Sequence, residues 1–336
     1  MRMRLKKLKD QVIVITGASS GIGLTTAEMA AERGARVVLN ARSEADLGAA
    51  VARIRQNGGR ATYVAGDVAD EETMELLARQ AVDEFGALDT WVNNAGIGLY
   101  GRLEDVAMAD KRRLFEVNFW AVVNGCKVAV RTMRQQGGGA IINIGSVESE
   151  RALPLHGVYA ASKHALKAYT DALRMELEAE AVPIAVTLVK PASINTPFTE
   201  HARNYVNEEA EYMPPVYAPE EVARAILRCA ESPTRDVIVG GSGKVISVME
   251  KVAPRTMDMY LQRVGFTAQK KNEPVHTGDA LYSAGPGGQR RGRTTHAVME
   301  RSSYTRAAMS DVARLMPAIA VGALVAGAVR SRQKSG

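Results

Sequence analysis

Tyr159 and Lys163 are a phenol and an ammonium group four positions apart, and they are the residues of this chain best suited to proton transfer. On a helix, this spacing places both side chains on one face. A free phenol has a pKa of about 10, but a neighbouring ammonium group favours the phenolate and lowers that pKa. Tyr159 is therefore a candidate general acid and base. Ser146 follows an expected strand, where its hydroxyl could hold a substrate oxygen beside the phenol.

The elements that must position these residues form an alternating pattern. Short runs rich in β-branched residues alternate with longer helical patterns, and the runs predict strands at 12–15, 36–40, 61–65, 90–93, 140–144, 184–189 and 236–239. The runs lack polar alternation, which is typical of strands buried on both faces. The predicted fold is therefore α/β, a doubly wound, mostly parallel Rossmann-type sheet of about seven strands with helices on both faces. Ligands of such sheets bind just after the carboxyl ends of the strands.

The first strand runs directly into a glycine-rich segment, 16–23, in which Gly17, Gly21 and Gly23 follow the pattern Gly-x-x-x-Gly-x-Gly. Glycines let the backbone turn sharply and approach a pyrophosphate, whose charge is stabilised by free amides and by a helix N-terminus. A purely structural turn is the alternative interpretation. The position after the first strand of a βαβ series argues for a dinucleotide site instead.

The end of the second strand bears on cofactor selectivity. NAD-selective sites carry an acidic residue near this point, whereas this chain has Ala41 and Arg42. An arginine can pair with the 2′-phosphate of NADP by charge-assisted hydrogen bonds, with Asn40, Ser43 or Ser19 assisting. We therefore expect NADP (NADPH) in preference to NAD. The alternative is a solvated surface arginine.

Taken together, these motifs resemble those of the short-chain dehydrogenase/reductase family, and the resemblance covers about residues 9–241. The motifs occur in family order: the glycine segment 16–23, Asp67 and Val68, Asn93 to Gly96, Asn118, Ser146, Tyr159-x-x-x-Lys163, and 191–196. A lone Tyr-x-x-x-Lys arises often by chance, but the whole ordered set does not. The resemblance implies an enzyme that acts on CH–OH donors with NADP.

The same resemblance implies roles for the catalytic residues Asn118, Ser146, Tyr159 and Lys163. Tyr159 would donate a proton to a ketone or aldehyde in reduction and accept one from a secondary alcohol in oxidation, while Ser146 orients the substrate oxygen. Lys163 would lower the phenol pKa and hold the nicotinamide ribose, and Asn118 would help to keep a proton-relaying water. The implied cofactor-binding residues are Gly17, Ser19, Ser20, Gly21, Ile22, Gly23, Arg42, Asp67, Val68, Asn94, Ala95, Gly96, Tyr159, Lys163, Pro191, Ile194 and Thr196.

Two segments, 148–156 and 198–217, are expected to determine substrate specificity. Glu148 and Ser149 stand where many relatives have small residues, so they face the substrate in one interpretation and form a solvated loop in the other. A second segment, 198–217, carries aromatic and apolar residues with a few polar groups, such as Tyr212, and is expected to act as a lid. No single residue identifies the carbonyl or alcohol substrate.

The composition is that of an ordinary globular protein. Of the 336 residues, 46% are hydrophobic and 24% charged, which argues against wholesale disorder and against a polytopic membrane protein. The net charge of +6 comes from the ends, because residues 1–9 carry five basic and no acidic side chains, and residues 250–336 carry fourteen basic and six acidic. The segment between them is mildly acidic, so no nucleic-acid partner is expected.

Other residue types point to the compartment and exclude other chemistries. Cys126 and Cys229 are the two cysteines of the sequence, too few for a disulfide framework, which favours a reducing compartment. The N-terminus shows no secretory signal, so a cytoplasmic location is expected. The five histidines include no His-x-x-x-His pair, and no metal site is expected.

The alternating pattern ends near residue 245, which predicts a cofactor-binding catalytic domain at 1–249 and a mainly helical extension at 250–336. The extension is expected to contain a helix over 247–264 interrupted by Pro254, a mobile Gly- and Arg-rich loop at 285–293, and a helix over 296–313. A last apolar run, 315–329, is shorter than the ~20 residues that span a bilayer. Three interpretations stay open for it: a helix packed on the body or on a neighbouring subunit, a tail resting on an anionic membrane, and a disordered end.

Two classes of function remain after these arguments. The leading one is an NADP(H)-dependent oxidoreductase that forms a homodimer or homotetramer, as the family commonly does. The alternative is a non-catalytic NADP-sensing or scaffolding protein that uses its tail for partner or membrane contact. An intact set of Ser146, Tyr159 and Lys163 argues against the alternative, because a sensor does not need an acid and base.

Overall fold

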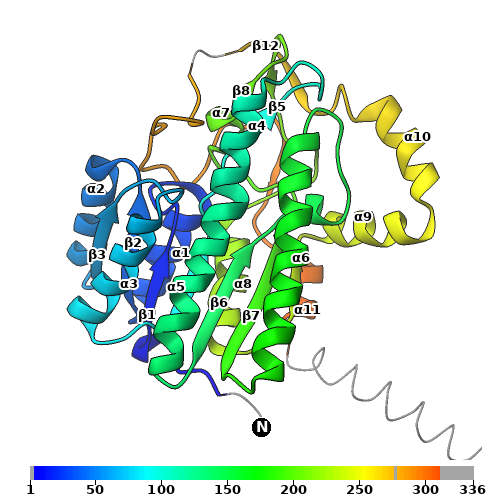
Figure 1. The fold of residues 1–336 in the computed structure, drawn as a ribbon. Coiled ribbons are helices and arrows are strands. Elements are labelled where there is room, and N and C mark those ends of the chain that lie inside the picture. Colours follow the sequence, from blue (N-terminus) through cyan, green and yellow to red (C-terminus); the bar gives the residue numbers. More distant parts are fainter. Residues whose placement is uncertain (1–3, 276–277, 311–336) are drawn as a thin grey trace, which may run out of the picture.

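The computed structural model describes residues 4–275 and 278–310, which are built around one seven-stranded parallel sheet (Figure 1). Its strands are β1 (Val12–Ile15), β2 (Arg36–Ala41), β3 (Arg60–Ala65), β4 (Thr90–Asn93), β6 (Gly139–Ile144), β7 (Ile184–Pro191) and β11 (Asp236–Val239). Their spatial order is β11-β7-β6-β4-β1-β2-β3, and every neighbouring pair is parallel. The Rossmann-type fold expected from the sequence is therefore confirmed.

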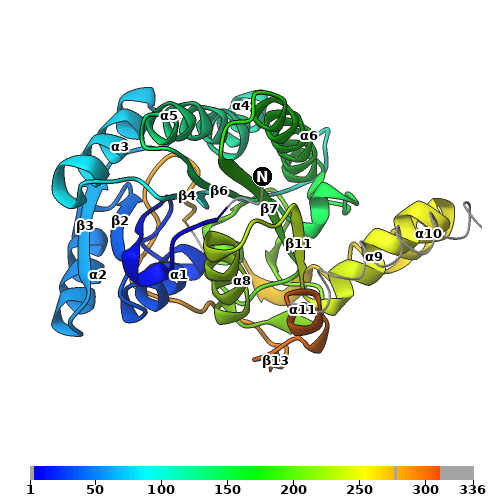
Figure 2. The ribbon, with the colours of Figure 1, turned by 90° about the horizontal axis from the view of Figure 1, so that it is seen from below.

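Helices cover both faces of this sheet (Figure 2). One face carries α1 (Gly21–Glu32), α2 (Glu44–Gln56) and α8 (Pro219–Glu231), and the other carries α3 (Glu71–Phe85), α4 (Met108–Phe115), α5 (Ala121–Gln135) and α6 (Gly157–Ala179). Within β1, Ile13 and Ile15 join the apolar cluster of the first face, whereas Val12 and Val14 join that of the second. This alternation explains why β1 contains no polar position.

The strand order reverses at β1, which lies between β2 and β4. From β1 the chain winds outward through β2 and β3, and it then returns to β4 and winds the other way through β6, β7 and β11. The loops that follow β1 and β4 therefore separate in opposite directions and leave a crevice at the carboxyl ends of the strands. Such a reversal is where doubly wound sheets bind their ligands.

One irregular turn interrupts the helix that leads from α4 to α5. Residues Glu116–Trp120 form a single π-helical turn between the two helices, and the turn contains Asn118. The sequence patterns predicted a helix here but not this widened turn. Turns of this kind occur frequently at functional sites.

The chain after β11 forms two helices and then returns to the body. α9 (Gly241–Val252) and α10 (Pro254–Val264) meet at the proline that was expected to interrupt this helix, and they project from the body (Figure 2). Further on, β12 (Lys270–Pro274) pairs with β9 (Glu208–Ala210), and β13 (Val298–Met299) pairs with β10 (Val216–Tyr217).

The end of the described chain differs from the helix predicted over 296–313. Its described part contains one short helix, α11 (Ser303–Ala308), because Val298 and Met299 pair with a strand and Ser302 caps the helix by accepting a hydrogen bond from Thr305. The apolar run 315–329 lies outside the described residues. Among the helices that the structure does describe, none has the length and apolar character needed to cross a membrane.

Candidate active site

Ser146, Tyr159 and Lys163 line one cavity of about 150 Å³ at the carboxyl ends of the strands. Ser146 follows β6, and the other two residues lie in the first two turns of α6. All three side chains are buried. The structure thus brings together three of the four residues expected to be catalytic.

The loop after β6 holds Ser146 in a fixed orientation. A short 3₁₀ helix, η3 (Val147–Ser149), begins there, and the Ser146 hydroxyl accepts a hydrogen bond from the backbone nitrogen of Glu148 at 3.0 Å. The Ser149 hydroxyl accepts a reciprocal bond from the Ser146 nitrogen at 3.2 Å. This capping box gives Ser149 a structural role. Of Glu148 and Ser149, only Glu148 lines the cavity.

The electrostatics of the phenol differ from the expectation. Burial raises the pKa of Tyr159, the Glu148 carboxylate raises it further, and a hydrogen bond with Ser146 lowers it. Lys163 donates to the Ile144 backbone oxygen at 2.9 Å and lies 5.6 Å from the centre of the Tyr159 ring. Burial lowers the pKa of Lys163 to about 8. In this structure the phenol therefore keeps its proton more firmly than a free tyrosine does.

Asn118 lies away from the cavity wall and acts on the neighbouring loop. Its Oδ1 atom accepts a hydrogen bond from the Ile97 nitrogen at 2.9 Å, and its Nδ2 atom donates to the Ile97 oxygen at 3.0 Å. The π-helical turn directs this amide toward the loop that follows β4. Asn118 thus positions a loop whose residues Asn94 and Gly96 line the cavity.

A second cavity, of about 180 Å³, adjoins the first. The two share part of their lining, which is made by Ile22, Asn94, Gly96, Thr196 and Phe198. Predicted cofactor residues that line the second cavity are Gly17, Ser19, Ser20, Gly21, Ile22, Arg42, Asp67, Val68, Asn94, Ala95, Gly96 and Thr196. Pro191 and Ile194 line the first cavity, together with Tyr159 and Lys163. The predicted cofactor residues that line these two adjoining cavities therefore lie along one continuous groove.

The glycine segment has the close backbone approaches that a dinucleotide site needs. Gly17 has a φ of +64°, and a Cβ atom there would lie 2.7 Å from the Ala95 Cα. Gly23 lines neither cavity, but a Cβ atom at this position would lie 2.2 Å from the Gly17 oxygen. Side chains at these positions would displace the turn from the start of α1, and a helix N-terminus is where a pyrophosphate could bind.

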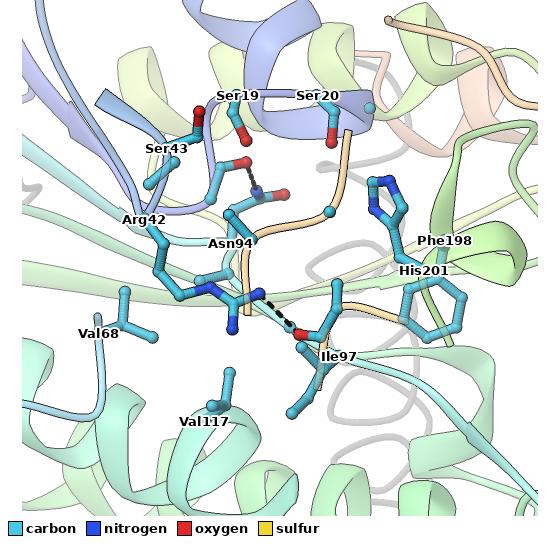
Figure 3. Close-up of a pocket in the computed structure, with 18 of the residues that line it drawn as sticks. Ser19, Ser20, Arg42, Ser43, Val68, Asn94, Ile97, Val117, Phe198 and His201 are labelled. Carbon is cyan, nitrogen blue, oxygen red and sulfur yellow. Dashed lines mark hydrogen bonds between the residues drawn. The ribbon is translucent and has the colours of Figure 1, made fainter. Parts of the chain in front are cut away.

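Arg42 offers an unpaired donor at the far end of this second cavity (Figure 3). Its Nη2 atom donates to the Ala280 backbone oxygen at 2.6 Å, while its buried Nη1 atom has no partner among the described residues. Burial lowers the pKa of this guanidinium. A buried cationic donor without an acceptor fits the 2′-phosphate of NADP. Asp67 at the same end is paired with Arg113.

Residues 279–293 of the extension, here called the strap, cross the cavity beside Arg42 (Figure 3). Gly288 donates a backbone hydrogen bond to Ser19 at 2.8 Å, and Gln289 accepts one from Gly21 at 2.9 Å. Arg290 forms an ion pair with Glu28 of α1. The Gly- and Arg-rich loop 285–293, predicted to be mobile, is thus docked on the glycine segment.

The other end of the strap is held by a polar cluster. Arg203 bridges Asp279 and Asp110 at 2.8 and 2.9 Å, and Tyr282 donates to Asp110 at 2.9 Å. Leu281, between these groups, is fully buried. Ala280, Ala284 and Gly285 consequently form part of the wall of the second cavity.

A family model described as short chain dehydrogenase matches residues 11–207 of this chain. The chain belongs to the short-chain dehydrogenase family. Over 335 residues it is 42% identical to an uncharacterized oxidoreductase, YxnA, of Bacillus subtilis, and the match covers 98% of this chain and 93% of that protein. It is 36% identical over 194 residues to the 3-ketodihydrosphingosine reductase of Bacteroides thetaiotaomicron, covering 58% of this chain and 68% of the relative.

Solved structures of short-chain dehydrogenases share the fold. One from Streptomyces avermitilis has a TM-score of 0.65 at 26% identity and covers 76% of this chain and 96% of that one. L-sorbose reductase from Gluconobacter frateurii, solved in complex with NADPH and L-sorbose, has a TM-score of 0.61 at 29% identity, covering 72% of this chain and 98% of that one. The match to YxnA extends over nearly the whole chain and therefore includes the strap.

Sequence reasoning missed several residues of this short-chain dehydrogenase's groove. Arg113 lines the second cavity from α4, and Tyr100 and Gln269 line the first. Tyr100 lies in β5 (Leu99–Tyr100), a two-residue strand paired with β8 (Arg203–Asn204). Such short strands leave no periodic pattern in a sequence. The strap likewise carries no motif that would place it beside the glycine segment.

Proposed function

We propose that this short-chain dehydrogenase is an NADP(H)-dependent oxidoreductase that interconverts a ketone or aldehyde and an alcohol, with Tyr159 as general acid and base. One observation carries the proposal. Ser146, Tyr159 and Lys163 line a cavity that shares its wall with the cavity of the glycine segment and Arg42. A carbonyl at the first cavity would adjoin a dinucleotide in the second.

NADPH supplies the hydride when bound, and the chain's residues supply orientation and the proton. The glycine segment and the start of α1 would hold the pyrophosphate, and the free Nη1 atom of Arg42 would pair with the 2′-phosphate. Support for NADP also comes from solved relatives, because one contains NADPH and another 5-hydroxy-NADP. We therefore propose NADP in preference to NAD.

Tyr159 would deliver the proton from its hydroxyl. Burial and the Glu148 carboxylate raise the pKa of this phenol, so it carries its proton at neutral pH and can donate it to a carbonyl oxygen. Ser146, held by its capping box, would orient that oxygen beside the phenol. The protonated phenol is the form that donates a proton when a carbonyl is reduced.

The non-catalytic alternative, an NADP-sensing or scaffolding protein, lacks such support. It requires the cofactor groove but not a buried serine, tyrosine and lysine at one cavity. We further propose a homodimer or homotetramer. The support is the family's common habit of assembly.

Tyr159→Phe tests the proposed chemistry because it removes only the hydroxyl. We expect a loss of turnover of at least about a hundredfold, measured by NADPH absorbance over a panel of ketones, aldehydes and secondary alcohols, with NADPH affinity retained. Tyr260→Phe is the matched control, since Tyr260 is exposed on α10. Full activity in Tyr159→Phe would defeat the assignment. A panel without cofactor-dependent turnover by the wild type would favour the sensing alternative.

A further inference from the structure

Glu148 and His156 form a buried polar pair in the wall of the catalytic cavity. The Oε1 atom of Glu148 lies 2.9 Å from Nδ1 of His156, and the two residues are 6% and 5% exposed. Both line the cavity that contains Ser146 and Tyr159. The sequence left Glu148 open between a substrate-facing and a solvated role, and its burial excludes the solvated one.

Neighbouring groups fix the pair in place. The backbone nitrogen of Glu148 is bonded to the Ser146 hydroxyl, so the carboxylate is tied to a residue expected to orient the substrate oxygen. The His156 ring packs edge-on against Tyr100 with 3.9 Å between ring centres. The same ring lies 5.6 Å from that of Tyr159. The pair thus lies beside the phenol.

Each member of the pair keeps one polar atom without a partner. Oε2 of Glu148 and Nε2 of His156 are buried, and no group of the described residues bonds to either. When Nδ1 of a neutral His156 donates to Glu148, both remaining atoms are hydrogen-bond acceptors. Buried acceptors of this kind are normally satisfied, so the wall is built to receive a donor.

The second carboxylate in this wall does not share the property. Glu211 accepts hydrogen bonds from Thr294, Thr295 and its own neighbour Tyr212. The Tyr212 hydroxyl is bonded to the Thr196 oxygen at 2.8 Å. The Glu211 carboxylate and the Tyr212 hydroxyl therefore already have hydrogen-bond partners within the chain, whereas Glu148 and His156 each keep one free acceptor.

We propose that Glu148 and His156 bind a hydrogen-bond donor on the carbon next to the reacting carbonyl, which makes α-hydroxy ketones and α-amino ketones the substrate class. Glu148 lines the same cavity as the phenol and acts on it electrostatically. A carbonyl oxygen held by Ser146 and Tyr159 would therefore bring its neighbouring carbon near the Glu148 carboxylate. A hydroxyl or ammonium group on that carbon would supply the donor that the two free acceptors lack. The inference rests on the proposed oxidoreductase function.

The decisive experiment compares two ketones of matched shape, hydroxyacetone and 2-butanone, with NADPH. A hydrogen bond to a charged acceptor corresponds to a selectivity of about tenfold to a hundredfold. We expect the wild type to favour hydroxyacetone in kcat/KM by that factor and Glu148→Gln to reduce the ratio by at least about tenfold. Aminoacetone distinguishes a hydroxyl donor from an ammonium donor. If the preference over 2-butanone depends on the charge of Glu148, it is larger for aminoacetone, which carries an ammonium group, than for hydroxyacetone.

Matched variants keep the result interpretable. Glu104→Gln makes the same substitution at an exposed position and is expected to leave the ratio unchanged. His156→Gln retains a donor for Glu148, so it provides a second test if Glu148→Gln fails to fold. A wild type without preference for hydroxyacetone, or a Glu148→Gln variant with an unchanged ratio, overturns the inference while the oxidoreductase function stands.

A binding measurement separates this inference from the proposed function. Hydroxyacetone is expected to raise the melting temperature of the wild type with NADPH more than 2-butanone does at equal concentration, and Glu148→Gln is expected to abolish the difference. If no ketone is turned over but this difference is present, the donor site stands and the proposed function fails. If there is neither turnover of a ketone nor a difference in melting temperature, both the donor site and the proposed function fail.

Discussion

The guanidinium of Arg42 donates a hydrogen bond to the backbone oxygen of Ala280, although 238 positions separate the two residues. The contact joins the loop after β2, where NADP selectivity is expected, to the strap of the C-terminal extension. The Nη2 atom of Arg42 thus holds the strap, while its Nη1 atom is left unpaired inside the cavity. The extension therefore belongs to the cofactor groove.

Replacing Arg42 should affect NADPH more than NADH. Arg42→Ala removes the unpaired donor proposed for the 2′-phosphate, and charge-assisted hydrogen bonds of this kind are worth about 1.5–3 kcal/mol each. We expect the affinity for NADPH to fall about tenfold to a hundredfold and that for NADH to change far less, as measured by fluorescence titration. Arg33→Ala, at an exposed position after α1, serves as the control. Equal losses for the two nucleotides would remove the argument for NADP.

Adding a methyl group at Gly292 should release the strap. A Cβ atom there would lie 2.2 Å from the Thr196 oxygen, and such overpacking costs about 1–3 kcal/mol. We expect Gly292→Ala to raise the rate of tryptic cleavage after Arg290, Arg291 or Arg293 about tenfold, as measured by mass spectrometry. An unchanged cleavage rate would show that the strap is not held by this contact.

The turn at the start of α1 should be equally intolerant of a side chain. A Cβ atom at Gly23 would meet the Gly17 oxygen at 2.2 Å and Nδ2 of Asn94 at 2.6 Å. Gly23→Ala should lower the stability by about 1–3 kcal/mol and the melting temperature by several degrees, and should weaken cofactor binding. Gly48→Ala, in α2 with nothing within 4 Å of its Cβ, is the control for both glycine variants. Equal melting temperatures for Gly23→Ala and the wild type would contradict the close approach.

The charge of Glu148 should be visible in the pH dependence of alcohol oxidation. This carboxylate raises the pKa of Tyr159, and oxidation requires the phenolate, so the rate rises with pH. Glu148→Gln removes the charge and lowers that pKa, which should move the rise in kcat/KM to lower pH. The measurement is a pH–rate profile for a secondary alcohol with NADP.

Other titratable groups face Glu148 and must be controlled in that profile. They are Tyr100 on β5, His156 and Lys163 near the start of α6, and Glu211 and Tyr212 after β9. His156→Gln removes the one imidazole among them, so a rise that persists in this variant belongs to another group. A rise in Glu148→Gln that stays in place or moves to higher pH would refute the electrostatic role.

Much of the fold could be predicted from the sequence because the strands are mostly apolar and lack a regular polar alternation. β1 shows the cause, since its alternate residues enter two different cores. The grouping of Ser146 with Tyr159 and Lys163 could also be anticipated, because parallel strands bring their carboxyl ends to one edge. Their chemical roles remain predictions for the experiments above.

What could not be predicted depends on tertiary contacts. The pKa of Tyr159 was expected to be lowered by Lys163, but burial and Glu148 raise it in the structure. The strap was expected to be mobile because Gly and Arg dominate its composition. The fully buried Leu281 and backbone hydrogen bonds hold it instead, and neither follows from local propensity.

The strap is joined to the glycine segment through main-chain atoms of Ser19, Gly21, Gly288 and Gln289. Main-chain bonds do not depend on which side chain a position carries. Substitutions at Gln289 can therefore accumulate in evolution as long as the length and path of the strap are kept. Homologues that share this contact are better sought by the spacing of the strap from the catalytic body than by the residue at this position.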